Sequence, residues 1–336
     1  MEPLRIIQFG LGAMGRVMAS IILKKRNMQL VAAIDRNPEN KGKDLGLILG
    51  LKKKTGIIVT DNAAEVFATI PADVMVHAAV SYVPKVWEQI KPAVEKGINV
   101  ITIAEEMGYP WVKYPQLCIE MDNLAKARQC RILGSGINPG FAMDLVPLLL
   151  TGICRRVDSI KVTRIIDFSP FGPSIQKNIG IGMTPQEFKE GITKGKLPLH
   201  IGLPESTYML AAALDWKITK VEETRDAVYA KHPLKIAGYM TVKKGNVVGF
   251  NHRCFAYKNG KKTITLEELG RVNPKEEYKN IITIEGDPKL TEWVNVPRGN
   301  ITTTSHAVNL IPALLKTAPG LRTMLDVPVA ALAPLE

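Results

Sequence analysis

The sequence contains few cysteines and no long apolar run. Its four cysteines, Cys118, Cys130, Cys154 and Cys254, are scattered through 336 residues, and no two form a C-x-x-C pair. This spacing argues against a disulfide framework and a cysteine zinc site, and it is typical of a cytoplasmic protein. Residues 1–5 lead directly into an apolar strand, so we expect no signal peptide. No apolar run approaches the roughly 20 residues of a membrane-spanning helix, so no membrane partner is expected.

Acidic residues are outnumbered by basic ones, and aromatic residues make up only 6% of the chain. The formal net charge is +12, but the lysines form short clusters, such as residues 52–54 and 261–262, without aromatic side chains between them. This pattern favours a basic surface that attracts an anionic cofactor over a nucleic-acid interface. The sequence also lacks a metal-ligand cluster, a Walker loop and internal repeats, so we expect neither a metal nor a nucleic-acid partner.

The first 35 residues carry the clearest motif. The apolar run Leu4–Phe9 is followed by Gly10, Gly12 and Gly15 in the spacing G-x-G-x-x-G. Apolar residues at helical spacing come next, and then a second apolar run that ends in Asp35. Strand, glycine turn, helix, strand and acid in this order are the fingerprint of a dinucleotide-binding βαβ unit. The three glycines would permit the turn, the approach of a pyrophosphate, and close packing of helix on strand.

The residues after this second strand bear on the choice of cofactor. Asp35 is placed to accept a hydrogen bond from a ribose hydroxyl, and its charge disfavours the 2′-phosphate of NADP. Arg36 can instead pair with that phosphate or stack on adenine. Because the two signals conflict, we predict use of both NAD and NADP. The cofactor-binding residues expected at the glycine turn are Gly10, Leu11, Gly12, Ala13, Met14 and Gly15.

Two neighbouring carboxylates follow a buried strand over residues 99–104. Glu105 and Glu106 stand at its carboxyl end, where doubly wound sheets bind their ligands, and Tyr109 and Trp111 come soon after. We interpret the pair as candidate acid–base groups. The alternative is that these acids only begin and cap the next helical turn.

Small residues mark the ends of two further strands. Ala78 and Ala79 follow an apolar strand and would let a ribose or nicotinamide approach, whereas His77 within that strand is interpreted as a packed residue. After a strand at 131–133, a glycine loop contains Asn138 and Gly140, which we expect to contact the cofactor. The alternative is a loop that only shapes the crossover between domains.

The pattern changes near residue 157, from alternating strands and helices to long strands with period-two alternation. The predicted fold class is α/β: an N-terminal Rossmann-type, doubly wound parallel sheet and a second α+β domain on an open, mainly antiparallel sheet. We place the first domain at residues 1–150, with residues 300–336 returning to it. Residues 151–299 form the predicted substrate and dimerisation domain. A homodimer is predicted mainly from the family resemblance described below, and pairing of two open sheets through their apolar faces is consistent with it.

The predicted substrate pocket draws on both domains. It comprises Tyr109, Phe141, Phe168, Gln176 and His200. For His200, which precedes a helix, a purely structural role is an equally good interpretation.

Several motifs together resemble a known family. GLGAMG, IAEEMGYPW, GSGINPGFAMDLVP, IGLPES and HAVNLIPALLKTAPGLRTM are similar to stretches of the 2,4-diaminopentanoate dehydrogenases and of the NAD(P)-dependent amine dehydrogenases. The whole group is similar in architecture to dihydrodipicolinate reductase. The resemblance runs from about residue 4 to residue 328, and its second and third motifs are far more specific than the glycine turn.

The resemblance implies oxidative deamination of a primary amine, or reductive amination of a small ketone or aldehyde with ammonia. A glutamate is the catalytic residue of the family, and it matches the pair Glu105 and Glu106. Spacing does not decide between the two, and we lean towards Glu105. A carboxylate there would take a proton from an ammonium and stabilise an iminium cation.

One departure from the family concerns the substrate. In the diaminopentanoate enzymes the stretch after Asp167 carries an arginine pair, whereas this sequence reads FSPFGPSIQKNIGIG there. Our hypothesis is a small alkyl amine without a carboxylate, because a carboxylate without a cationic partner binds poorly in a buried pocket. Lys177 keeps 2,4-diaminopentanoate open as an alternative. Oxidation of an alcohol, reduction of an imine, and a nicotinamide-sensing regulator are the remaining alternatives.

Overall fold

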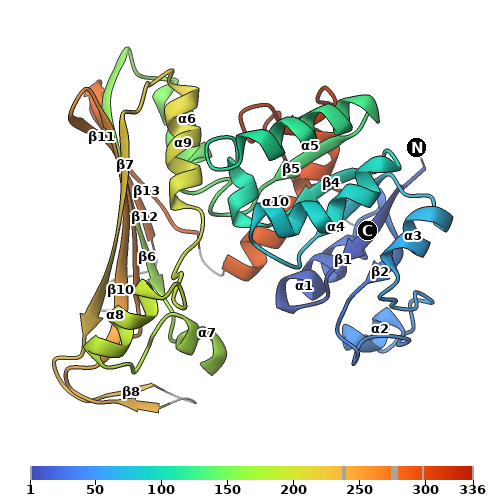
Figure 1. Cartoon of the computed structure of the whole chain (residues 1–336), viewed down its shortest axis with the longest axis horizontal. Helices are drawn as coiled ribbons and strands as arrows, with labels where there is room; N and C mark the ends of the chain where they lie inside the picture. Colours follow the sequence, from blue (N-terminus) through green and yellow to red (C-terminus); the bar gives the residue numbers. More distant parts are fainter. Residues whose placement is uncertain (1, 237–239, 274–278, 297–298, 335–336) are drawn as a thin grey trace. The chain divides into compact units, whose positions relative to one another are not determined.

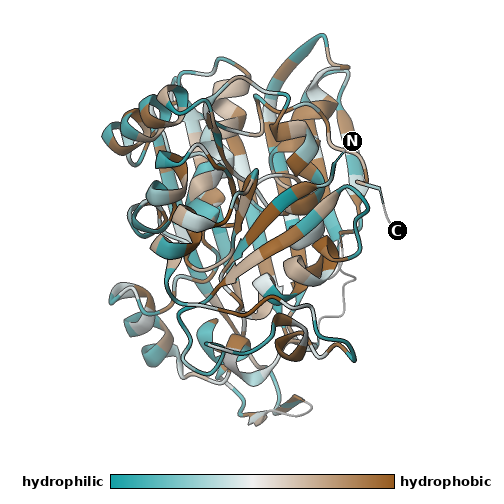
Figure 2. Cartoon of the chain, turned by 90° about the vertical axis from the view of Figure 1, so that its right-hand side faces the viewer, coloured by the Kyte–Doolittle hydropathy of each residue, from teal (hydrophilic) through white to brown (hydrophobic). Residues whose placement is uncertain are grey.

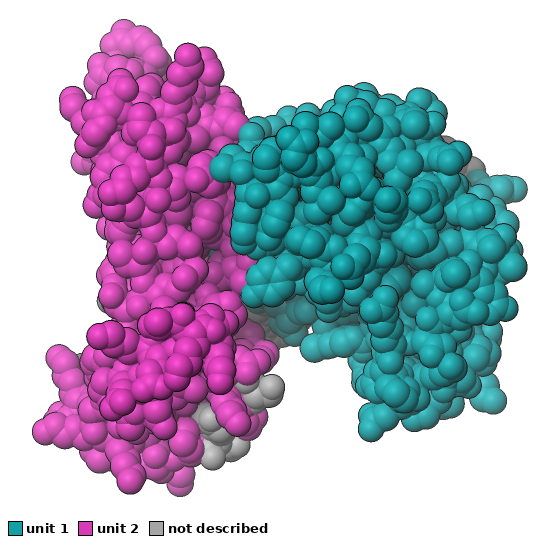
Figure 3. Space-filling view, viewed as in Figure 1, with its two compact units in different colours: residues 1–141, 298–336 teal, residues 142–297 magenta. Residues whose placement is uncertain are grey.

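The computed structural model describes residues 2–236, 240–273, 279–296 and 299–334. Two compact units divide the chain: residues 1–141 with 298–336 form the first, and residues 142–297 form the second (Figure 3). The first boundary thus lies before α6 (Leu145–Thr151), whereas the sequence pattern placed it at residue 150. The reason is that α6 packs on strands and a helix of the second unit.

The first unit is built on a six-stranded sheet in which every pair of neighbouring strands is parallel. The strand order is β14-β5-β4-β3-β1-β2, which confirms the predicted doubly wound class. Its strands are β1 (Leu4–Phe9), β2 (Met28–Ile34), β3 (Val74–His77), β4 (Asn99–Thr102), β5 (Arg131–Gly134) and β14 (Gly320–Arg322). Outside these strands, isolated bridges join Ile34 to Thr60 and Asp44 to Ile58.

Amphipathic helices accompany this sheet. In α4 (Val83–Glu95) the buried residues Val83, Val86, Ile90 and Val94 recur at helical spacing, and they join the core that the strands form. The helices carry both hydrophobic and hydrophilic segments (Figure 2). Besides α4, the helical segments of the first unit are α1 (Ala13–Ile22), α2 (Leu45–Ile48), α3 (Ala63–Thr69), the 3₁₀ turn η1 (Glu105–Gly108), α5 (Pro115–Ala127) and α10 (Gly299–Leu314).

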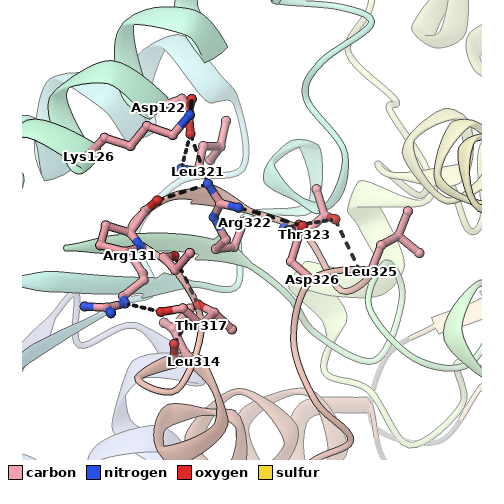
Figure 4. Close-up of polar contacts among 12 residues, drawn as sticks. Asp122, Lys126, Arg131, Leu314, Thr317, Leu321, Arg322, Thr323, Leu325 and Asp326 are labelled. Carbon is pink, nitrogen blue, oxygen red and sulfur yellow. Dashed lines mark hydrogen bonds and ion pairs between the residues drawn. The ribbon is translucent and has the colours of Figure 1, made fainter. Parts of the chain in front are cut away.

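The C-terminal segment returns to the first unit and adds an edge strand. Helix α10 packs against α1, and β14 then pairs with β5. Polar contacts fix this strand, because Asp122 of α5 accepts hydrogen bonds from the Leu321 N–H at 3.0 Å and from the Arg322 guanidinium at 3.2 Å (Figure 4). Next along the chain, Asp326 accepts from the Thr323 hydroxyl at 2.9 Å.

The second unit is built on a mixed six-stranded sheet of order β13-β12-β6-β11-β10-β7. Its pairs are antiparallel except for β6 and β11, which run parallel. The strands are β6 (Arg156–Asp167), β7 (Lys220–Tyr229), β10 (Val247–Lys258), β11 (Lys261–Arg271), β12 (Lys279–Asp287) and β13 (Leu290–Val294).

Helices cover one face of this second sheet. Helix α6 contacts β6 and β12, α8 (Pro185–Thr193) contacts β7, and α9 (Leu203–Ala213) contacts β10 and β11. The opposite face is bare in Figure 1, and we call it the outer face. Its ion pairs join Lys161 to Glu267 at 2.9 Å, and Arg253 to both Glu267 at 2.9 Å and Asp226 at 3.0 Å.

Shorter elements complete the second unit. The strands β8 (Leu234–Ile236) and β9 (Met240–Val242) form an antiparallel pair, and residues 237–239 lie outside the described chain. Residues 170–182 form a Pro- and Gly-rich insert after β6, and it contains a short helix, α7 (Pro173–Asn178). Over the described ranges, no helix is long and apolar enough to cross a membrane.

Candidate active site

The glycine turn after β1 packs tightly against neighbouring backbone. Gly10 has φ +88°, and a Cβ at this position would lie 2.6 Å from the carbonyl oxygen of Ala78. A Cβ at Gly15 would lie 1.9 Å from the carbonyl oxygen of Gly10, which also accepts a hydrogen bond from the side chain of Gln8 at 2.9 Å. These positions need glycine because the protein itself fills the space. The turn also brings Ala78 beside it, at the end of the adjacent strand β3.

At Gly12, in contrast to Gly10 and Gly15, the protein leaves space for a side chain. A Cβ built there meets no atom within 4 Å, and the residue is exposed. It is the N-cap of α1, and no side chain caps this end of the helix. An open cradle at the uncapped N-terminus of a ten-residue helix fits the phosphates of a dinucleotide. Ala13 is exposed and Met14 partly so, whereas Leu11 is buried.

Asp35 lies at the end of β2 and is only 7% exposed. Its carboxylate accepts hydrogen bonds from the N–H of Leu11 at 2.5 Å, from the N–H of Asn37 at 2.7 Å and from the side chain of Asn40 at 3.2 Å. The carboxylate of Asp35 therefore stabilises the glycine turn, and about one of its four lone-pair sites remains available to accept a hydrogen bond from a ribose hydroxyl. Arg36 is exposed.

The two candidate glutamates have different surroundings. Glu106 is 1% exposed; its carboxylate accepts the N–H of Val83, the first residue of α4, at 3.0 Å and forms an ion pair with Lys113. This carboxylate therefore caps α4 and is held by a cation. Such contacts are those of a structural acid.

Glu105 is partly exposed, and its carboxylate makes no hydrogen bond or ion pair to any residue in the described part of the chain. It begins η1, which is anchored on two sides. The N–H of Glu106 donates to the Ser81 carbonyl at 3.3 Å, and a Cβ at Gly108 would lie 2.7 Å from Pro139. Glu105 thus stands among the chain segments that follow β3, β4 and β5.

The loop after β5 carries Asn138 and Gly140. Gly140 has φ +125°, and a Cβ there would collide with Gly136 at 2.5 Å. Asn138 is 8% exposed, and its neighbour Pro139 packs against Gly108 of η1. The structure therefore brings the loop and η1 together, as expected for the segments that follow the neighbouring strands β5 and β4.

Two of the predicted pocket residues lie in the first unit. Tyr109 directly follows η1, and burial together with the nearby Asp326 raises the pKa of its hydroxyl. The ring of Phe141 packs edge-on against His306 of α10, with 5.1 Å between ring centroids.

The other three predicted pocket residues lie in the second unit. Phe168 is buried beside Phe250, with 5.8 Å between their ring centroids. Gln176 is 1% exposed, and its side-chain N–H groups donate to the carbonyls of Phe168 at 3.1 Å and Phe171 at 2.9 Å. In this structure the side chain of Gln176 therefore stabilises the backbone of the insert through these hydrogen bonds. The side chain of His200 is 19% exposed and lies 3.8 Å from the carboxylate of Glu268.

Sequence reasoning missed two residues that support the site. Gln8 lies within strand β1, and His306 lies on helix α10. The only signal for Gln8 was an amide side chain among the apolar residues that end β1, a pattern typical of a buried group with a specific hydrogen-bond partner. The polar first half of α10 gave no comparable signal for His306. In the described residues, no group of three or more His, Cys, Asp or Glu side chains is placed to hold a metal ion.

Comparison with known proteins agrees with the two-part architecture. Residues 4–102 match the family profile of the dihydrodipicolinate reductase N-terminus, and residues 141–334 match that of the 2,4-diaminopentanoate dehydrogenase C-terminal domain. The 2,4-diaminopentanoate dehydrogenase of Acetoanaerobium sticklandii is 36% identical over 98% of this chain and 94% of that protein.

Two amine dehydrogenases are also similar. That of Streptomyces virginiae is 24% identical over 96% of each chain. The solved structure of the Mycobacterium smegmatis amine dehydrogenase superposes with a TM-score of 0.86 at 30% identity, covering 99% of this chain and 98% of that one. A full-length match at this identity, together with the C-terminal profile, establishes the relationship. The chain belongs to the 2,4-diaminopentanoate dehydrogenase family.

Proposed function

We propose that the protein is an NAD(P)-dependent amine dehydrogenase, which interconverts a primary amine with a small ketone or aldehyde and ammonia. The observation that carries this proposal is Glu105, a partly exposed carboxylate among the ends of three parallel strands. Glu105 and the open cradle at Gly12 both follow carboxyl ends of strands in the first sheet, and the carboxyl ends of parallel strands share one edge of their sheet. Relatives named as amine and diaminopentanoate dehydrogenases support the same chemistry.

The roles of the residues follow from their surroundings. Gly12 and the N-terminus of α1 would hold the pyrophosphate, and Asn138 and Gly140 would contact the nicotinamide half. The nicotinamide would supply the hydride donor or acceptor. Glu105 would take the proton from the substrate ammonium, leaving a nucleophilic amine, and its negative charge would stabilise the iminium cation. Glu106 would keep η1 in place through α4.

For the substrate we propose a small alkyl amine and its ketone or aldehyde. The insert after Asp167 carries no arginine, and Lys177 is exposed, in a hollow of about 320 Å³ beside Glu187 and Lys196. The second candidate is 2,4-diaminopentanoate, which the name of the 36%-identical relative favours. The reverse assay separates the two, because it follows the reduction of NAD⁺ or NADP⁺ with either a small alkyl amine or 2,4-diaminopentanoate as the substrate.

The decisive experiment follows NADH and NADPH consumption with a panel of ketones and aldehydes, with and without ammonium. Ammonium-dependent turnover is expected in the wild type. It should fall about 10²–10⁴-fold in Glu105→Gln, because the acid–base group is lost while its shape is kept. Turnover without ammonium would instead identify an alcohol or imine oxidoreductase.

For the cofactor we propose use of both NAD and NADP. The charge of Asp35 is shared among three N–H donors, which weakens its repulsion of a 2′-phosphate, and Arg36 stands exposed next to it. In Arg36→Leu, NADPH affinity should fall about tenfold and NADH affinity less than twofold. An equal loss of both affinities would contradict this assignment.

We further propose a cytoplasmic homodimer formed through the outer face of the second sheet. The four cysteines are free thiols, as expected in a reducing compartment. The outer face carries half-buried apolar side chains, among them Leu269 and Phe255, around its ion pairs. Such a face is normally covered by a second copy or by another element.

A further inference from the structure

One face of α10 holds the loop that follows β5. Thr303 and His306 are one turn apart on this helix, and both contact the loop. The Thr303 hydroxyl accepts the N–H of Ile137 at 3.4 Å, and a Cβ at Gly136 would lie 3.2 Å from the Thr303 methyl group. His306 contacts the other end of the loop, where its ring packs against Phe141. The position of the loop is therefore set by α10.

The imidazole of His306 is neutral and its tautomer is defined. Burial lowers its pKa to about 4, although a hydrogen bond with the backbone of Gly140 opposes this shift. A backbone bond that favours the protonated ring is one that the ring donates to a carbonyl oxygen. Nε2 has no partner among the described residues, so Nδ1 makes this bond and carries the proton. Nε2 is consequently a hydrogen-bond acceptor.

This acceptor is buried and lacks a donor. A buried polar atom without a partner is unfavourable, and native proteins rarely keep one unless a ligand or a water completes it. His306 contacts Gly140 and Phe141 of the loop proposed to bind nicotinamide, and Pro139 of the same loop packs on η1. A bound dinucleotide offers donors for such a site in its ribose hydroxyls and its carboxamide.

We propose that His306 is a further cofactor-binding residue, whose Nε2 accepts a hydrogen bond from an O–H or N–H group of the nicotinamide half. Its Nδ1 and its ring meanwhile position the loop through Gly140 and Phe141. The inference rests on the proposed nicotinamide cofactor and is independent of which amine is oxidised.

Titration of the purified full-length protein with NADH, NADPH, ADP-ribose and ADP tests this role by calorimetry. ADP lacks the nicotinamide half, and ADP-ribose retains only its ribose. In His306→Phe, affinity for NADH and NADPH should fall about tenfold, while ADP affinity stays within about twofold. A parallel loss for ADP-ribose would identify a ribose hydroxyl as the donor, and an unchanged ADP-ribose affinity would identify the carboxamide.

Two further variants separate the ligand contact from the support of the loop. Asn at position 306 can keep a donor near Nδ1 but places no acceptor at Nε2, whereas Gln reaches the Nε2 position. We expect His306→Gln to retain more NADH affinity than His306→Asn. Full affinity in His306→Phe, an equal loss for NADH and ADP, or rescue by Asn and not by Gln would each overturn the proposal. No amine is present in these titrations, so failure of the amine assay would leave their result unaffected.

Discussion

At the scale of single residues, two adjacent glutamates with the same side chain have opposite surroundings. Glu106 is buried against the start of α4 and Lys113, whereas Glu105 faces outward from the same 3₁₀ turn. A 3₁₀ turn has three residues per turn, so consecutive side chains point about 120° apart. One therefore enters the protein and the other is left for a ligand.

Glu106→Gln should affect stability more than chemistry. Gln can still accept the Val83 N–H, but it loses the ion pair with Lys113, so we expect a loss of about 1–2 kcal/mol in the free energy of unfolding. The measurement is denaturant unfolding of this variant beside Glu105→Gln, which should stay near the wild-type stability. If Glu106→Gln were stable but as inactive as expected for Glu105→Gln, the assignment of roles would be reversed.

The glycine turn allows binding and packing to be tested separately. Gly12→Ala adds a methyl group where the protein has no atom within 4 Å, so stability should change by less than about 1 kcal/mol while cofactor affinity falls about tenfold. Gly15→Ala places its Cβ 1.9 Å from the Gly10 carbonyl and should destabilise the protein by about 3 kcal/mol or more. Thermal unfolding and NADH titration of the pair are the measurements. Equal destabilisation by both substitutions would refute the open cradle.

At the scale of elements, a buried histidine links two strands and a helix of the first unit. His77 of β3 is fully buried, and its ring nitrogens lie 2.8 Å from the Thr102 hydroxyl on β4 and 2.8 Å from the Gln89 side chain on α4. Burial lowers its pKa to about 4, against the hydrogen bond to Gln89. His77 is thus a packed residue here, and its two bonds tie α4 to the sheet beneath it.

This histidine should make stability fall with decreasing pH. Between pH 6.5 and about 4 the unfolded chain binds a proton at His77 that the native state does not, which lowers the free energy of unfolding by about 1.4 kcal/mol per pH unit. The contribution is complete above pH 6.5 and is lost towards pH 4. Urea unfolding at several pH values should show a smaller slope in His77→Gln. The control is His232→Gln, at an exposed histidine, for which the slope should match the wild type.

At the scale of the whole molecule, the chain forms two units with different sheets. A parallel sheet must be covered on both faces, so its strands are buried over most of their length and mainly apolar, as β1, β3 and β4 are. In the second sheet, β10 and β11 alternate buried and partly exposed residues, and helices cover the face opposite the outer face. This difference is why the class of each sheet was predictable, and it is the reason for proposing the outer face as the site of dimerisation.

The proposed dimer predicts a specific effect of charge on the outer face. Leu269 is half-buried on this face of β11, paired in register with Ile165 of β6 and Asn251 of β10. The wild type should sediment as a dimer at micromolar concentration, and Leu269→Asp should shift it towards the monomer. Leu47→Asp makes the same exchange at a residue of the first unit that is 60% exposed, and it should leave the dimer intact. A monomeric wild type would end this proposal.

Local spacing determined much of this protein from the sequence alone. Local sequence patterns predicted the glycine turn, the strands of the first sheet and the change to long alternating strands near residue 157, because these features depend on residues that are neighbours along the chain. The predicted family and fold class are confirmed. Tertiary structure decided what depends on contacts between distant segments. It paired β6 with β11 in parallel, made Gln176 a brace, buried Glu106 rather than Glu105, and set His306 against the loop after β5. Spacing in the sequence cannot specify these contacts, because the environment of each such side chain is created by residues far away along the chain.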